Sequence, residues 1–129
     1  MKRIVLSLIA FYFTCSATAQ SLVSMSPNTL IQGSQTTITS TVTGLGTLFQ
    51  SSSPPNSILD ANLTNGINTY YGDTWGIWPN DDEHADIPFN FGAAPVLGAY
   101  TLNVIYWDPN AWATGFQTTV TLPNAFTVL

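Results

Sequence analysis

Apolar residues recur at every second position through much of the chain after residue 20. In the run TTITSTVT at residues 36–43, Ile38 and Val42 share one face with Thr36 and Ser40, while four threonines line the other face. Residues 100–107 alternate in the same way, with Tyr100, Leu102, Val104 and Tyr106 on one face. A period of two in β-branched and aromatic residues predicts half-buried β-strands.

The same alternation, bounded by glycine, proline and asparagine, predicts further strands at residues 22–25, 59–63, 87–91, 116–122 and 126–128, and an element that begins at residues 47–49. Asn65-Gly66 favours a hairpin turn, because both residues tolerate a positive φ. Pro88 favours an edge position or the start of a strand. With no helix to cover a lone sheet, about seven antiparallel strands predict one all-β, immunoglobulin-like sandwich over residues 20–129.

The first residues have the pattern of a secretory signal. Lys2 and Arg3 precede an apolar run at residues 4–13, and the small-x-small pattern of residues 17–19 comes just before Gln20. The apolar run is about half of the roughly 20 residues that a membrane-spanning helix needs. We therefore expect residues 1–19 to be a signal peptide, with cleavage after residue 19.

Cys15 offers an alternative, which is lipid attachment at the cysteine. A lipoprotein signal usually has leucine three positions before the cysteine and a small residue directly before it, whereas Tyr12 and Thr14 stand there. Cleavage without lipidation is the better match. It predicts a mature form that is secreted, periplasmic or at the cell surface, and is not inserted in a membrane.

Charge changes the choice of partners. Both cationic side chains of the chain lie in residues 1–19, so residues 20–129 carry seven carboxylates and neither lysine nor arginine. A chain without cations cannot neutralise phosphates, which excludes nucleic acid as a natural partner and disfavours anionic membranes. An extracellular protein or a glycan remains as the expected partner.

Both ends of residues 20–129 carry a family resemblance. Ser26-Pro27-Asn28, then Gly33 and a threonine-rich strand ending at Gly44, resemble the opening of bacterial immunoglobulin-like domains of the IPT/TIG type. Gly98-Ala99-Tyr100 with LNVIYW, and the run at residues 119–128, are similar to their last strands. The resemblance implies an exported surface module used for adhesion, glycan contact or the spacing of other domains. The segment 70–86 departs from the pattern, because an aromatic and acidic excursion replaces a plain hairpin.

That excursion holds a group of carboxylates: Asp81, Asp82, Glu83 and Asp86. Ca²⁺ takes six to eight oxygen ligands in irregular geometry, so these residues are candidate calcium ligands, which Asn80 and Asp73 could join. The spacing does not match an EF-hand loop. The alternative is a solvated loop that keeps the protein soluble. His84 could belong to a transition-metal site, although no second histidine supports zinc.

Aromatic residues gather in two segments. The excursion has Tyr70, Tyr71, Trp75 and Trp78, and Trp107 and Trp112 flank the loop at residues 108–115. Flat rings suit the apolar faces of sugars, and the neighbouring Asp73, Asn80, Asn110 and Gln117 could hydrogen-bond to sugar hydroxyls. If both loops lie at one end of the sandwich, they form one aromatic surface. The alternative is that rings such as Trp107 or Trp75 fill the ends of the core.

Catalysis has little to draw on. Residues 20–129 have neither a G-x-S-x-G elbow nor a lysine or arginine, and most of the carboxylates cluster in one segment instead of facing each other across a cleft. The sequence therefore predicts a non-catalytic exported module for protein interaction, adhesion or structural display. A carbohydrate-binding module, with or without calcium, is the alternative. A small hydrolase built on His84 is the third hypothesis.

Overall fold

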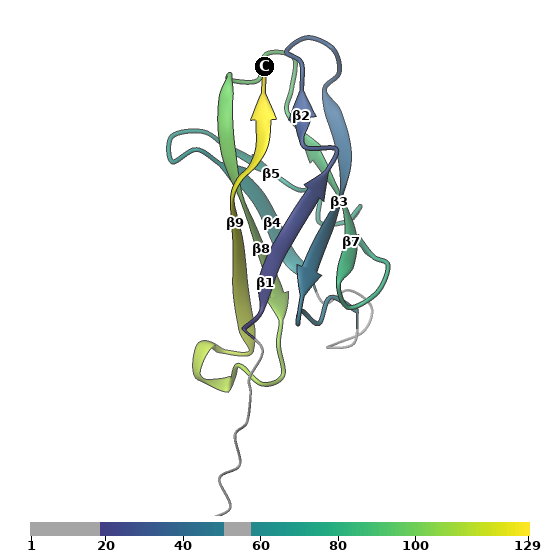
Figure 1. Ribbon diagram of the computed structural model, residues 1–129, viewed down its shortest axis with the longest axis vertical. Coiled ribbons are helices and arrows are strands. Elements are labelled where there is room, and N and C mark those ends of the chain that lie inside the picture. Colours follow the sequence, from purple (N-terminus) through teal and green to yellow (C-terminus); the bar gives the residue numbers. More distant parts are fainter. Residues whose placement is uncertain (1–18, 51–57) are drawn as a thin grey trace, which may run out of the picture.

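The computed structural model describes residues 19–50 and 58–129, and these residues form two facing β-sheets (Figure 1). The signal peptide expected at residues 1–19 lies outside this part of the chain except for its last residue, and so do the lipidation alternative at Cys15 and the loop expected at residues 51–56. All strands and the whole core described here lie between Gln20 and Leu129.

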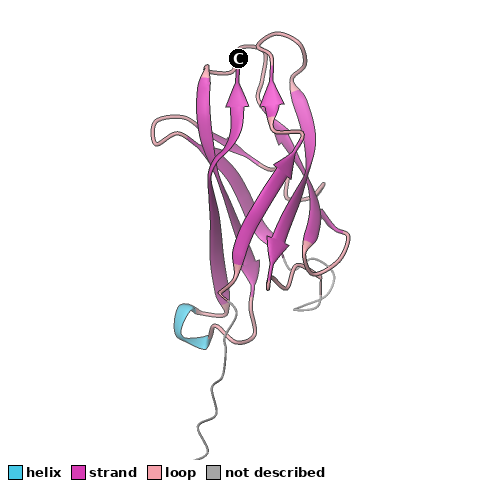
Figure 2. Cartoon of the chain, viewed as in Figure 1, coloured by secondary structure: helices cyan, strands magenta, loops and turns pink. Residues whose placement is uncertain are grey.

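Nine strands are described: β1 (Ser21–Ser26), β2 (Thr29–Leu30), β3 (Thr37–Leu45), β4 (Ile58–Thr64), β5 (Thr69–Tyr71), β6 (Trp78–Pro79), β7 (His84–Asn90), β8 (Gly98–Trp107) and β9 (Gln117–Val128). Sheet A has the order β1-β3-β7-β6, and sheet B has the order β2-β9-β8-β4-β5. Within the described residues, helical structure is limited to the 3-10 turn Trp112–Thr114 in the β8–β9 connection (Figure 2). The prediction of an all-β, two-sheet domain is confirmed.

The apolar positions that alternate in the sequence are the buried positions of the strands. In β3, Ile38, Ser40 and Val42 point inward while the threonines at positions 37, 39 and 41 are exposed. In β8, every second residue from Tyr100 to Tyr106 is fully buried. The core lies between the sheets and includes Phe49, Ile87, Phe89, Phe91 and Phe126. Apolar burial between two sheets is thus the main source of stability in residues 20–129, which have no cysteine, lysine or arginine.

Two predictions about the strands are wrong. The sequence predicted about seven antiparallel strands, but nine are formed and β2 pairs in parallel with the end of β9. No strand forms at residues 47–49. Instead, the Thr47 hydroxyl donates to the carbonyl oxygen of Asp82 at 2.6 Å, and the Phe49 N–H donates to the same oxygen at 3.1 Å. These bonds fold the segment back onto the β6–β7 connection and place the Phe49 ring in the core.

Gly44 is required where this segment folds back. A Cβ at position 44 would lie 2.4 Å from the Thr47 hydroxyl oxygen, and Thr47 is buried. Its short, branched side chain is already held by its hydrogen bond and cannot swing away. In the sequence, Gly44 only marks the end of a predicted strand. In the structure, the absence of a side chain at Gly44 makes room for Thr47.

The prediction that Pro88 lies at a sheet edge or at the start of a strand is wrong. Pro88 lies in β7, between β3 and β6, so it is not on an edge strand. However, β6 pairs with β7 only at Asp86 and Ala85, and the carbonyl of Pro88 accepts from the Asp73 N–H at 2.8 Å on that same side. In a strand, the backbone N and C=O of one residue point to the same side. The nitrogen of Pro88, which has no hydrogen to donate, therefore points to the β6 side, where β6 does not extend and no hydrogen bond of the sheet is lost.

A cluster of polar side chains lies where β8 ends and β9 begins, next to Gln20 at the start of the described chain. The carboxylate of Asp108 accepts from Gln20 Nε2 at 3.1 Å, from the Thr118 hydroxyl at 3.0 Å and from the Asn110 N–H at 2.9 Å. Gln20 Oε1 in turn accepts from the Tyr106 hydroxyl at 2.5 Å. Burial opposes ionisation of Asp108, but these donors outweigh it and lower its pKa. Burial, with the nearby Asp108 charge, raises the pKa of Tyr106 well above its ordinary value.

Candidate functional site

The aromatic residues singled out in the sequence differ widely in exposure. Trp75 is 96% exposed, Trp112 is 77% exposed and Trp78 is 68% exposed, and Tyr71 also faces solvent. The ring of Tyr70 instead packs against those of Phe91 and Tyr100, and Trp107 stacks on Phe116 with ring centres 5.3 Å apart. Of the two tryptophans expected to fill the core ends, Trp75 is fully in solvent, while Trp107 is half-buried against one ring.

The exposed tryptophans of the two aromatic segments lie on different sheets, while Tyr70 and Tyr71 are in β5 of sheet B. Trp75 and Trp78 lie beside β7, in sheet A, whereas Trp112 is in the β8–β9 connection of sheet B. In Figure 1 that connection is at the lower left, and the connection into β7 is on the right. The segments therefore do not meet in one aromatic surface, and each must be considered separately.

Trp78 ends a row of side chains that crosses the outer face of sheet A. It pairs in register with Asp86 of β7, which pairs with Thr41 of β3. All three side chains point outward, because the neighbouring Ala85 and Ile87 are fully buried. The Thr41 hydroxyl donates to Asp86 Oδ1 at 2.6 Å, which fixes the orientation of the carboxylate beside the indole.

Trp75 is held on the same edge by a tight turn. Asp73 Oδ1 accepts from the Trp75 N–H at 3.1 Å, and the Asp73 carbonyl accepts from the Gly76 N–H at 2.9 Å. The turn is attached to β7 by the Asp73–Pro88 hydrogen bond, and a Cβ at Gly76 would lie 2.7 Å from Pro88 Cγ. The absence of a side chain at Gly76 thus lets the turn lie against β7. We call Trp75, Trp78 and Asp86 together the tryptophan edge.

Three of the acidic residues, Asp81, Asp82 and Glu83, line one open hollow with Thr47, Gln50 and His84, and Asp86 lies apart from them. Asp82 Oδ1 accepts from the Gln50 N–H at 3.1 Å, and Glu83 Oε1 accepts from the Gly46 N–H at 3.2 Å. Both carboxylates thereby hold the segment at residues 46–50. Asp86 is directed to Thr41 on the face of sheet A. The charges that the sequence grouped for calcium are thus divided between a loop and a strand face.

Asp81 and His84 form an exposed pair. Asp81 Oδ1 accepts from the Glu83 N–H at 2.8 Å and also lies 2.8 Å from His84 Nδ1. The Glu83 N–H, followed by His84, lowers the pKa of Asp81. Among residues 19–50 and 58–129, no three histidine, cysteine or acidic side chains converge as a metal site would require. Calcium binding stays a prediction.

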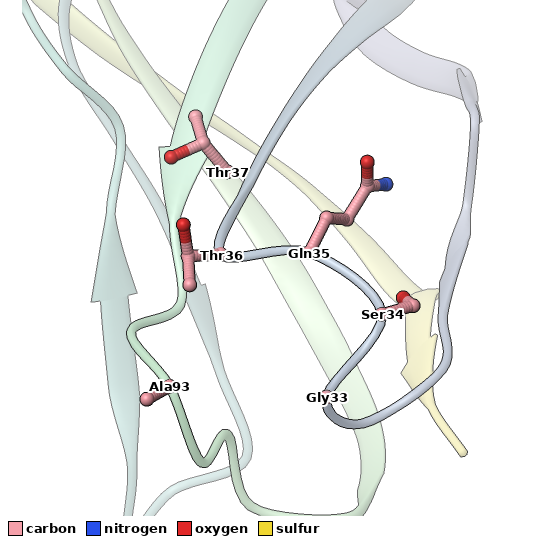
Figure 3. Close-up of a pocket in the computed structure, with 6 residues that line it drawn as sticks. All are labelled: Gly33, Ser34, Gln35, Thr36, Thr37 and Ala93. Carbon is pink, nitrogen blue, oxygen red and sulfur yellow. The ribbon is translucent and has the colours of Figure 1, made fainter.

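Two other surfaces are polar. On the outer face of sheet B, Asn103 Nδ2 donates to Asn62 Oδ1 at 3.0 Å and the Thr121 hydroxyl donates to Asn103 Oδ1 at 2.9 Å. A shallow hollow near the turn before β3 is lined by Gly33, Ser34, Gln35, Thr36, Thr37 and Ala93 (Figure 3). Its lining has no aromatic ring and no charge. The row on sheet B also includes the exposed ring of Tyr71, which pairs with Asn62, but neither this row nor the hollow has a charged side chain, as the tryptophan edge does.

No protein-family model, curated protein or solved structure matches the chain. The resemblance to IPT/TIG domains stays a prediction. In the described part of the chain, no helix is long and apolar enough to cross a membrane. Function must therefore be inferred from the side chains of the two sheets.

Proposed function

We propose that the chain is an exported, non-catalytic immunoglobulin-like module that binds a partner at the cell exterior through the tryptophan edge. The observation that carries the proposal is the exposure of Trp75 and Trp78, at 96% and 68%, on one edge of a sheet whose outer face is otherwise mainly polar. Removing such a ring from water is favourable by about 25 cal/mol per Å² of apolar area, and the part of this that exceeds the entropic cost of association stabilises a complex. Exposed tryptophans grouped on a polar surface are typical of binding sites.

The strand order supports the immunoglobulin-like part of the proposal. Immunoglobulin domains place strands A, B, E and D in one sheet, and G, F and C in the other. Sheet A has its strands in an equivalent order, β1-β3-β7-β6, and sheet B has the order β9-β8-β4-β5 with β2 added beside β9. The parallel β2–β9 pair then corresponds to a first strand divided between the two sheets.

The rigidity of the edge supports a binding role. Trp78 is paired with β7, and Trp75 is in a turn with two internal hydrogen bonds and one to Pro88. A backbone that is already held in place loses little further conformational freedom in a complex. The edge is therefore suited to contact a partner without rearranging.

Retention on cell envelopes tests this function. The chain from Gln20 onward has no lysine, so its N-terminal amine can be labelled selectively, and retention on envelopes of the producing cells can be measured by fluorescence. We expect the Trp75→Ala/Trp78→Ala variant to be retained about thirtyfold more weakly, because two exposed rings that become buried contribute at least about 2 kcal/mol.

Trp112→Ala is the matched control. It also removes an exposed indole, but from the β8–β9 connection of sheet B. We expect its retention to equal that of the unchanged chain. The proposal fails if the unchanged chain is not retained, or if the control and the double variant lose retention equally.

A further inference from the structure

We propose that the partner of the tryptophan edge is an uncharged polysaccharide, whose sugar ring stacks on Trp78 while its hydroxyls bind Asp86. This inference rests on the proposed function, since it names the ligand of the same surface. A sugar ring has apolar C–H faces and a rim of hydroxyl groups. It needs a flat aromatic ring with hydrogen-bonding groups placed to one side, and the row formed by Trp78, Asp86 and Thr41 has this arrangement.

The spacing of the row fits a ring and its hydroxyls. Neighbouring strands lie about 4.8 Å apart, so Asp86 is one strand away from Trp78 and Thr41 is two strands away. A sugar stacked on the Trp78 indole therefore extends its rim over β7, where the Asp86 carboxylate points outward. Trp78 and Asp86 are paired on adjacent strands of one sheet, which keeps the separation of their backbones fixed.

Asp86 has acceptor capacity left for sugar hydroxyls. A carboxylate offers about four lone-pair positions, and the Thr41 hydroxyl uses one of them on Oδ1. No donor among the described residues contacts Oδ2. Hydrogen bonds from neutral hydroxyls to an ionised carboxylate are stronger than those between neutral groups. The Thr41 bond also holds the carboxylate in place before a ligand arrives.

Trp75 provides a second stacking position along β7. Its turn is attached at Pro88, two residues beyond Asp86, which is about 7 Å along the strand. The turn that carries Trp75 is therefore attached farther along β7 than Trp78, on the same side of that strand. A polymer of several sugars can contact both indoles, whereas a single sugar contacts only one, so we expect a polysaccharide ligand.

The negative charge of the segment that carries the tryptophan edge disfavours the binding of acidic polysaccharides. Five of the seven carboxylates in residues 20–129 lie between Asp73 and Asp86, and no lysine or arginine accompanies them. A polyanionic polysaccharide would be repelled, while an uncharged one meets no electrostatic barrier. Binding of a neutral polymer should also be insensitive to salt, because it involves no ion pair.

Treated envelopes distinguish a glycan from a protein partner. We expect retention of the labelled chain to survive protease digestion of the envelopes and about 0.5 M sodium chloride, where screening is nearly complete. Periodate, which cleaves vicinal diols of sugars, should abolish it. Trp78→Ala and Asp86→Asn should each weaken retention about tenfold or more, and Trp112→Ala should not.

The outcomes separate the two proposals. Retention that depends on Trp75 and Trp78 but is lost on protease digestion, and withstands periodate, identifies a protein partner. That result overturns the polysaccharide inference and leaves the proposed function standing. Full retention of Asp86→Asn would also overturn the inference, whereas equal retention of the tryptophan double variant and the unchanged chain would overturn both.

Discussion

Replacement of Phe89 by alanine is expected to lower the free energy of unfolding by about 3–5 kcal/mol. Phe89 is fully buried in β7, where it faces Ile38 of β3 and its ring centre lies 6.4 Å from that of Phe91. Removing the ring leaves a cavity between the two sheets that neighbouring β-strands cannot collapse to fill. Denaturant unfolding monitored by tryptophan fluorescence measures the change.

Phe116→Ala is the control for Phe89→Ala. The same ring is removed, but from a residue that is 40% exposed and packs on Trp107 outside the core. We expect a loss of about 1 kcal/mol or less. Comparable losses in the two variants would contradict the position of the core between the sheets.

Asp108→Asn is expected to lower the free energy of unfolding by about 2–3 kcal/mol at neutral pH, because hydrogen bonds to a charged acceptor contribute about 1.5–3 kcal/mol. Asp108 is only 4% exposed and accepts from Gln20, Thr118 and the Asn110 N–H. The amide of asparagine would turn a donor toward these donors. Denaturant unfolding again measures the change. The control is Asp86→Asn, which removes the charge from the acceptor of a single hydrogen bond on the exposed face, and we expect it to cost about 0.5 kcal/mol or less.

The pH dependence of this difference is a second observable. The pKa of Asp108 is lowered in the folded chain, so its contribution is complete above the unfolded value of about 3.9 and is lost as the pH falls through the folded value. The gap in stability between the unchanged chain and Asp108→Asn should therefore narrow below about pH 4. A gap that stays constant down to pH 2 would contradict the charged role of Asp108.

Most strands could be predicted because burial between sheets imposes a period of two on each strand independently. Residues 100–107 alternate clearly in the sequence and lie within β8. Pairing depends instead on contacts between distant segments. The parallel pairing of β2 with β9 involves only two residues of β2, a length at which no alternation can be recognised. The segment at residues 47–49 reads as a strand, but its bonds to the Asp82 carbonyl keep it out of both sheets.

The candidate site could be predicted only as a set of residue types. The tryptophans and Asp86 stand out in the sequence, but there Asp86 was grouped with the neighbouring acids as a calcium ligand. Its partner Thr41 is 45 residues away, and only the β3–β7 register brings the two together. The alternation of β3 does predict that Thr41 lies on the outer face, so the position of one partner of the Thr41–Asp86 hydrogen bond could be predicted from the sequence. The exposure of Trp75 depends on a turn that is held by Asp73, and a turn of this kind leaves no periodic pattern in the sequence from which it could be predicted.

Hydrogen–deuterium exchange of the chain bound to envelopes tests the binding face most directly. If the tryptophan edge is the contact surface, amides at residues 73–79 and 84–88 should be protected on binding, while those at residues 108–117 should exchange as in the free protein. Protection confined to the β8–β9 connection, or no change at residues 73–79 in a chain that is retained, would contradict the assignment of the binding face to sheet A.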